Sequence, residues 1–182
     1  MVIYAARDLT CRSQARDLLA LAVRETWGLS PLPEIARREG GKPYFPRHEE
    51  LHFNLSHSGA LALCALDSGP VGADVQIIKE WRPGLPERVC SPAELAWLEE
   101  QPGLWPAFTL LWTLKEARAK ESGRGLTSSI RDIRVPLLGD GPVRMDGLWF
   151  RTWTGSSWAA AVCGHTQPPE YFFEKALDIP TV

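Results

Sequence analysis

Alternating and continuous runs of apolar side chains predict a group of strands in the first half of this chain. Residues 51–56 (Leu-His-Phe-Asn-Leu-Ser) alternate apolar and polar side chains, which is typical of a strand with one buried face. Residues 61–66 form a continuous apolar run, and residues 71–78 follow after a further turn. The short connections favour antiparallel pairing of these three strands, because parallel neighbours need a long crossover.

Two segments have the features of helices. Ser13 can cap a helix that runs to about Thr26, with apolar groups mostly on one side. A long helix is predicted over residues 106–121, which are rich in good helix formers and are followed by a Ser-Gly stop. Between these helices, residues 91–94 (Ser-Pro-Ala-Glu) have the composition of a capping box.

Five further stretches are predicted to be extended. They are residues 2–6, 35–38, 130–137, 148–154 and 158–162. Each half of the chain then has about one helix and an antiparallel set of strands, so the fold class is α+β. The tail beyond residue 167 gives no clear pattern.

Composition narrows the function classes. With 182 residues the chain can bury a substantial core, and its formal net charge of −2 argues against a nucleic-acid binder that relies on bulk electrostatics. No apolar run is long enough to span a membrane, and the N-terminus lacks the features of a signal peptide. The four cysteines show no CxxC pair or metal-ligand spacing. We therefore expect a cytoplasmic protein without nucleic-acid or membrane partners.

Two turns carry candidate phosphate contacts. Residues 37–43 place cations beside a Gly-Gly turn, where backbone amides can approach an anion, although a solvated turn explains them as well. Residues 54–59 place Ser56, His57 and Ser58 at a strand end. A hydrolase using Ser56 and His57 is an open alternative, but adjacent residues on a strand point to opposite sides, and no G-x-S-x-G motif is present. Phosphate contact is the better functional interpretation, and a capped turn is its structural alternative.

Two carboxylates complete the candidate chemistry. Asp74 lies between apolar neighbours on a predicted strand, where an acid must be paired, hydrogen-bonded or metal-bound. In the long helix, Trp112, Glu116 and Lys120 are spaced four residues apart and share one face. Taken alone, Glu116 and Lys120 could be a surface pair that contributes only about 0.3–0.5 kcal/mol. One Asp and one Glu, with phosphate oxygens, are a common ligand set for Mg²⁺.

In this order and spacing the segments resemble the 4′-phosphopantetheinyl transferases, specifically the type that activates non-ribosomal peptide and polyketide synthases. The likeness covers roughly residues 13–165. The matching stretches are residues 41–43 (GKP), 53–59 (FNLSHSG), 72–75 (GADV), 112–120 (WTLKEARAK) and 123–126 (GRGL). The W-x-x-K-E-x-x-x-K helix with an upstream G-x-D is the specific part, and the other motifs support it.

The resemblance implies a fold and a reaction. The family fold is a pseudo-dimer of two similar α+β halves, each a small antiparallel sheet with a packed helix, and the active site lies in the cleft between them. Here the halves would be residues 1–76, with the coenzyme A phosphate contacts, and residues 77–182, with the catalytic helix. The family transfers the phosphopantetheine arm of coenzyme A to a serine of an apo acyl or peptidyl carrier protein. Mg²⁺ is required, and adenosine 3′,5′-bisphosphate is released.

The resemblance also assigns residues. Catalysis would use Glu116, which helps to deprotonate the serine, and Lys120, which holds phosphate oxygens. Coenzyme A contacts, including those made through bound Mg²⁺, would come from Arg37, Lys42, Asn54, Ser56, His57, Asp74 and Lys120. Asp74 and Glu116 would bind the metal. We expect a monomer.

The sequence departs from the family pattern at two places. Gln76 stands where many relatives have Glu, so a third acidic metal ligand is missing, although Gln76 should face the same side as Asp74. The N-terminal segment is compressed, and either Arg12 or Arg16 would meet the 3′-phosphate.

Besides the hydrolase, a second functional alternative stays open, and the role of one segment is undecided. The chain could be a coenzyme A-binding relative without transferase activity that serves as a binding or regulatory partner. Residues 81–97, rich in Trp and Pro, could dock the carrier protein or simply pack the core of the second half.

Overall fold

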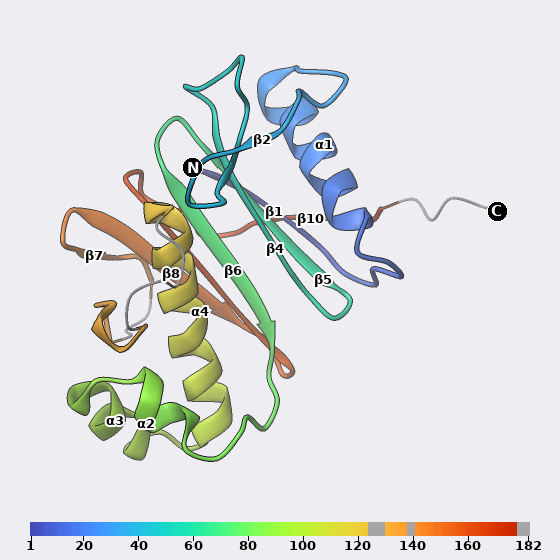
Figure 1. The fold of residues 1–182 in the computed structure, drawn as a ribbon. Helices are drawn as coiled ribbons and strands as arrows, with labels where there is room; N and C mark the ends of the chain where they lie inside the picture. Colours follow the sequence, from blue (N-terminus) through green and yellow to red (C-terminus); the bar gives the residue numbers. More distant parts are fainter. Residues whose placement is uncertain (124–129, 138–140, 178–182) are drawn as a thin grey trace.

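Two four-stranded sheets form the centre of the computed structural model, which describes residues 1–123, 130–137 and 141–177 (Figure 1). The first sheet has the order β10-β1-β5-β4, formed by Phe173–Lys175, Val2–Ala6, Leu61–Asp67 and His52–Ser58. The second has the order β6-β9-β8-β7, formed by Val71–Ile77, Trp158–Gly164, Leu148–Thr154 and Val143–Met145. All strand pairs are antiparallel except β1 with β10. A short hairpin, β2 (Ala36–Arg37) with β3 (Pro43–Tyr44), stands beside them.

One long helix packs on each sheet, which confirms the α+β class. Helix α1 (Gln14–Trp27) buries Leu18, Ala22 and their neighbours with the first sheet. Helix α4 (Leu104–Ser122) buries Leu111, Leu114 and their neighbours with the second. A third cluster joins the sheets to each other, with side chains from β1 and β5 against β6 and β9. The core therefore has three apolar layers, stacked between α1 and α4.

Smaller elements surround the start of α4. Helices α2 (Leu85–Val89) and α3 (Pro92–Glu99) lie there (Figure 1). The 3₁₀ turn η1 (Ile130–Asp132) lies further along α4, where the Ile130 carbonyl accepts a hydrogen bond from Lys115. The predicted capping box is confirmed, because Ser91 and Glu94 exchange hydrogen bonds between side chain and backbone. Within the described part of the chain, no helix is long and apolar enough to cross a membrane.

Strands β4 and β6 meet at the seam between the sheets. Their backbones are not paired, and side chains of alternate β4 residues accept hydrogen bonds from alternate β6 amides instead. The donor–acceptor distances are 3.0 Å for Ala73 N–Asn54 Oδ1, 3.3 Å for Val75 N–Ser56 Oγ and 3.1 Å for Ile77 N–Ser58 Oγ. Three polar side chains thus satisfy the outward amides of an edge strand that would otherwise be buried without partners.

The seam corrects one topological prediction. The strands predicted at 51–56 and 61–66 do pair antiparallel, but the strand predicted at 71–78 pairs with β9 and not with β5. The boundary between the two sheets along the chain is consequently not at residues 76 and 77, because β6 (Val71–Ile77) continues across that point. Strand β6 belongs to the second sheet, and the C-terminal strand β10 returns to the first. The halves 1–76 and 77–182 stay a prediction about domains.

The strand predicted over residues 130–137 is wrong. This segment forms η1 and then continues without regular structure to residue 137. Its backbone carbonyls at Ile130 and Ile133 accept hydrogen bonds from the buried Lys115 ammonium, at 3.1 and 2.9 Å, so they are not available to a sheet. Strands β7 and β10 and helix α2 were not predicted, since each has only three to five residues.

Gly72 allows β6 and α4 to touch through their backbones. A Cβ at this position would lie 1.9 Å from the Ala117 carbonyl oxygen and 2.6 Å from the Glu121 amide nitrogen. Only a residue without a side chain fits there, which gives a packing reason for the glycine of the G-x-D motif. The contact also sets the depth at which α4 lies over Asp74.

We expect Gly72→Ala to destabilise the fold by about 1–3 kcal/mol, the usual cost of overpacking a core. The substitution forces α4 away from β6, and a denaturant titration would measure the loss. Gly69→Ala is the matched control, because a Cβ there has no neighbour within 4 Å, and it should change the free energy of unfolding by less than about 0.5 kcal/mol. Equal stability of the two variants would contradict the close approach.

Candidate active site

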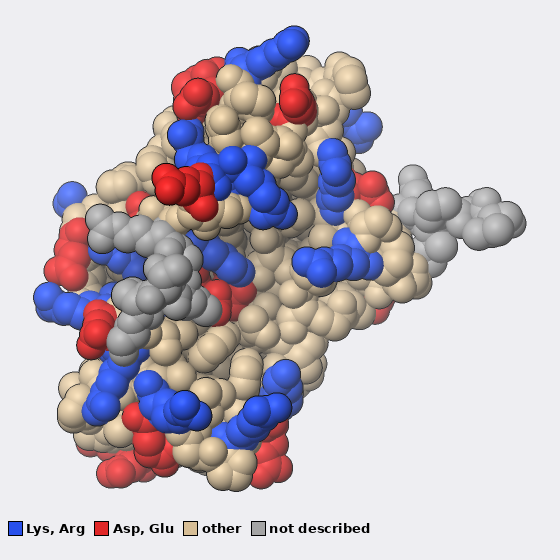
Figure 2. All heavy atoms as spheres, viewed as in Figure 1, with Lys and Arg blue, Asp and Glu red and all other residues tan. Residues whose placement is uncertain are grey.

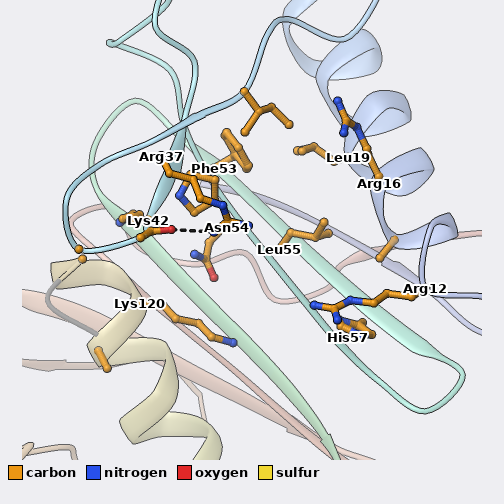
Figure 3. A pocket seen from close by; sticks show the side chains of 17 residues that line it. Arg12, Arg16, Leu19, Arg37, Lys42, Phe53, Asn54, Leu55, His57 and Lys120 are labelled. Atoms are coloured by element: carbon orange, nitrogen blue, oxygen red, sulfur yellow. Dashed lines mark hydrogen bonds between the residues drawn. The ribbon is translucent and has the colours of Figure 1, made fainter. Parts of the chain in front are cut away.

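A cavity of about 610 Å³ lies between α1, β4, the β2–β3 hairpin and the C-terminal turn of α4 (Figure 3). Basic side chains surround it, and Figure 2 shows Lys and Arg gathered around a hollow on this face. The cations that line the cavity are Arg12, Arg16, Arg37, Lys42 and Lys120, joined by His57. Such a concentration of positive charge in a chain of net charge −2 indicates a site for an anion.

Apolar side chains form another part of the cavity wall. Leu19 from α1, Ile35 before the hairpin, and Phe53 and Leu55 from β4 line it. The α1 and hairpin sides thus combine cations with an apolar surface, so the ligand that fits should carry both phosphate groups and a flat or apolar part.

Asp74 is only 1% exposed and is connected to this cavity through Lys120, which lines it. Its Oδ1 accepts hydrogen bonds from Lys120 Nζ at 2.6 Å and from Ser56 Oγ at 2.7 Å. Its Oδ2 accepts one from Gln76 Nε2 at 3.1 Å, which confirms that Gln76 faces the same side. A buried carboxylate is tolerated when its oxygens are satisfied in this way.

Lys120 bridges α4, β4 and β6. Besides Asp74, its ammonium donates to Ser56 Oγ at 3.2 Å and to the Ala73 carbonyl at 3.3 Å. The described contacts include no ion pair between Lys120 and Glu116, so the surface-pair alternative is wrong for Lys120. Its ammonium also borders the cavity.

Glu116 is half-buried, and burial raises its pKa above the ordinary value. The Asp74 carboxylate raises the pKa further, and the Lys120 ammonium opposes the shift. No hydrogen bond or ion pair of the Glu116 side chain occurs among the described residues. The carboxylate is therefore a group that would gain from a bound cation.

Asp74 and Glu116 fit Mg²⁺ in the chemistry of their donors. The described residues contain no group of three or more His, Cys, Asp or Glu side chains that could hold a metal. Two carboxylates nevertheless match Mg²⁺, which prefers oxygen ligands, usually keeps several waters and takes one or two carboxylates beside phosphates. The Gln76 amide adds a neutral oxygen, and Ser58 Oγ lies 3.4 Å from it.

The remaining predicted phosphate contacts divide into two groups. His57 lines the cavity, and burial lowers its pKa, with Arg12 and Lys120 lowering it further. Arg37 also lines it and donates to the Gly41 carbonyl at 2.8 Å. Arg12 and Arg16, between which the sequence did not choose, both line it.

Three other predicted residues have partners inside the protein. Asn54 lines the cavity, and its Oδ1 accepts the hydrogen bond from the Ala73 amide of β6. Ser56 is buried and donates to Asp74. Lys42 lines the cavity, but its ammonium donates to the Val71 carbonyl at 3.2 Å and the Glu121 carbonyl at 2.7 Å. The described contacts include no hydrogen bond between Ser56 and His57, so a Ser–His hydrolase pair is absent from them.

Sequence reasoning missed the role of Lys115. This motif residue is fully buried and pairs with Glu94 at 2.9 Å, in addition to the carbonyls after residue 129. The motif pattern contains no sign of this structural role, because the partners of Lys115 lie on α3 and in the segment after residue 129. The last matching stretch, 123–126, lies outside the described residues beyond Gly123.

The proposed carrier-docking segment packs mainly into the core. Trp81 lies against the second core cluster, with its ring centroid 5.2 Å from that of Trp112, and its Nε1 donates to Thr109 Oγ1 at 3.2 Å. Leu85 and Trp97 also pack against this cluster. These contacts favour the core alternative for Trp81 and Leu85.

Comparisons with known proteins identify the family. The family model described as the 4′-phosphopantetheinyl transferase superfamily matches residues 70–171, which is more than half of the chain. The chain belongs to this superfamily. A 4′-phosphopantetheinyl transferase of Bacillus subtilis is 34% identical over 132 residues, which cover 71% of this chain and 59% of the relative.

Other relatives agree. The transferase Sfp of Bacillus subtilis strain 168 is 34% identical over 62% of this chain and 51% of its own length. The transferase AcpT of Salmonella typhi is 46% identical over 52% of each chain. The chain spans about half the length of the curated relatives it matches.

The raised pKa of Glu116 predicts a pH-dependent stability difference. A carboxylate whose folded pKa exceeds the unfolded value of about 4.3 destabilises the protein above its folded pKa and not below the unfolded one. In metal-free protein, Glu116→Gln should therefore raise Tm near neutral pH, with the gain disappearing at about pH 4. Thermal scans across this range in chelator measure it, and the exposed Glu99→Gln is the control. A lower Tm at neutral pH would mean that Lys120 outweighs burial and Asp74.

Proposed function

We propose that this protein transfers the 4′-phosphopantetheine arm of coenzyme A to a serine of an apo acyl or peptidyl carrier protein, in a reaction that requires Mg²⁺. The observation that carries the proposal is the joining of a cation-lined, partly apolar cavity to the Asp74–Glu116 carboxylates in a member of this superfamily. Adenosine 3′,5′-bisphosphate is the second product.

The cavity suits coenzyme A in charge and shape. The apolar wall of Leu19, Ile35, Phe53 and Leu55 offers a surface for a purine base. Arg12 or Arg16 would meet the 3′-phosphate, and His57 and Arg37 would add further phosphate contacts. Because an anion stabilises the imidazolium, the lowered pKa of His57 should rise when the ligand binds.

The chemistry needs a base, charge neutralisation and a leaving group. The serine oxygen attacks the phosphorus that bears the pantetheine arm, and the bond from that phosphorus to the adenosine bisphosphate oxygen breaks. Glu116, directly or through a water, takes the serine proton. Mg²⁺ held by Asp74 and Glu116 would neutralise the charge of the pyrophosphate. Lys120, at the cavity edge, would exchange its contact with Asp74 for phosphate oxygens.

The direct test is intact-mass analysis of an apo carrier protein after incubation with the enzyme, coenzyme A and Mg²⁺. We expect the mass to increase by one phosphopantetheine group. Glu116→Ala should abolish the increase while remaining folded, and Glu99→Ala, an exposed helix glutamate, should behave as wild type. An unmodified carrier despite measurable coenzyme A binding would favour the binding partner without transferase activity, and full transfer by Glu116→Ala would exclude the proposed base.

The proposed two-carboxylate metal site makes a separate prediction about Gln76. In Gln76→Glu a second carboxylate would replace the amide that donates to Asp74 Oδ2 at 3.1 Å, so the metal-free protein should lose thermal stability. Added Mg²⁺ should restore it and half-saturate transfer at a lower concentration than in wild type. Asp74→Asn should be far more damaging, because it removes one of two acidic ligands and the partner of Lys120.

Thermal scans and transfer rates across a Mg²⁺ titration measure both effects. The two-carboxylate site would be refuted by an inactive Gln76→Glu variant together with near-normal activity in Asp74→Asn.

A further inference from the structure

Lys42 occupies the junction of three elements. Lys42 lies in the β2–β3 hairpin, directly after the Gly-Gly turn. Its side chain extends from the hairpin to the second sheet and to helix α4. There its ammonium contacts the first residue of β6, at the Val71 carbonyl, and the end of α4, at the Glu121 carbonyl. It therefore ties the hairpin wall of the cavity to the two elements that carry Asp74, Glu116 and Lys120.

The end of α4 needs such a partner. The last carbonyl oxygens of a helix accept no hydrogen bond from an amide within the helix, and the helix dipole makes this end negative. Gly123, the C-cap residue that follows α4, has φ of +70°, and a Cβ there would lie 3.3 Å from Lys42 Cδ. The aliphatic stem of Lys42 thus packs over the terminal glycine while its charge meets the final turn.

The three arginines of the cavity differ from Lys42, whereas Lys120 is likewise bonded to the protein, through Asp74, Ser56 and the Ala73 carbonyl. The guanidinium groups of Arg12 and Arg16 make no hydrogen bond or ion pair among the described contacts, and Arg37 donates within its own turn. Lys42 donates at two points to backbone of the other sheet and its helix. Burial, moreover, lowers the pKa of its ammonium, as expected for a group that is withdrawn from solvent. In the ligand-free protein, the Lys42 ammonium is therefore already hydrogen-bonded to the backbone of β6 and α4.

We propose that Lys42 is a positioning residue, which holds the hairpin wall against α4 and β6 and thereby sets the spacing between the phosphate-binding cations and the carboxylates. This role replaces the direct phosphate contact expected from the sequence. The proposal rests on the proposed function only for the identity of the ligand, since the junction exists in the ligand-free protein.

The decisive experiment is hydrogen exchange by mass spectrometry on ligand-free protein. Lys42→Met keeps the stem and removes the ammonium, so amides in the last turn of α4 and at the start of β6 should exchange roughly 10- to 100-fold faster. This corresponds to the loss of a charged hydrogen bond of about 1.5–3 kcal/mol. Lys42→Arg should retain most of the protection. Arg37→Met, in the same hairpin, should leave α4 unchanged, because its guanidinium bonds only Gly41 among the described contacts.

Calorimetric binding of coenzyme A separates the two roles. If Lys42 is a positioning residue, Lys42→Met should bind coenzyme A more weakly, and its α4 and β6 amides should exchange faster in the absence of ligand. Weaker binding with wild-type exchange would mean that Lys42 is a phosphate ligand, and the proposal would be overturned. Failure of Lys42→Met alone to fold, with Lys42→Arg and Arg37→Met folded, would support the scaffold role. The exchange measurement does not depend on transfer, so an inactive wild type would refute the function and leave this result intact.

Discussion

The contact on which the rest of the structure depends is the row of hydrogen bonds between β4 side chains and β6 amides. An edge strand placed inside a protein leaves every second amide without a partner, and unsatisfied buried amides are costly. Asn54, Ser56 and Ser58 supply the missing acceptors and so hold two separate sheets in one register. Ser56 also donates to Asp74, so the group that joins the sheets also orients the candidate metal ligand. The Ser56 hydroxyl thus contributes both to joining the two sheets and to positioning Asp74.

Charge in this protein is organised locally rather than overall. A chain of net charge −2 lines one cavity with five cations and places Asp74 and the half-buried Glu116 next to them. Among the cavity cations, Lys120 has a specific partner in Asp74, whereas the guanidinium groups of Arg12 and Arg16 line the cavity without a hydrogen bond or ion pair among the described contacts. The net charge argues against a nucleic-acid binder that relies on bulk electrostatics, but it does not reveal this local arrangement.

The sequence predicted those features that depend on short-range pattern. Alternation at 51–56 and helix formers at 106–121 led to the correct strand and helix. The family resemblance assigned Asp74 and Lys120 to one site, and the two side chains form an ion pair. Motif matching also named Asn54 and Ser56, but as phosphate neighbours, whereas much of their bonding capacity serves β6. Such a role depends on which strands become neighbours, and the pattern within one strand does not contain that information.

Long-range requirements explain the remaining errors. Residues 130–137 have the apolar spacing of a strand, yet a buried ammonium fifteen residues or more upstream takes their carbonyls. Lys42 has the same character, since its partners lie 29 and 79 residues away. In both cases a lysine interacts with main-chain oxygens of a distant segment, and no local propensity records such a contact.

Glu94 and Lys115 link two helices through one buried ion pair. Glu94 closes the N-terminus of α3 and at the same time neutralises the ammonium that precedes Glu116 in sequence. Removing either partner alone would leave an uncompensated charge in the interior, which is far more costly than replacing both together. During divergence, these two positions can therefore be exchanged only in concert, and a lineage that loses one must pass through a poorly folding intermediate. A buried ion pair between α3 and α4 thus restricts how freely the helix that carries Glu116 and Lys120 can evolve.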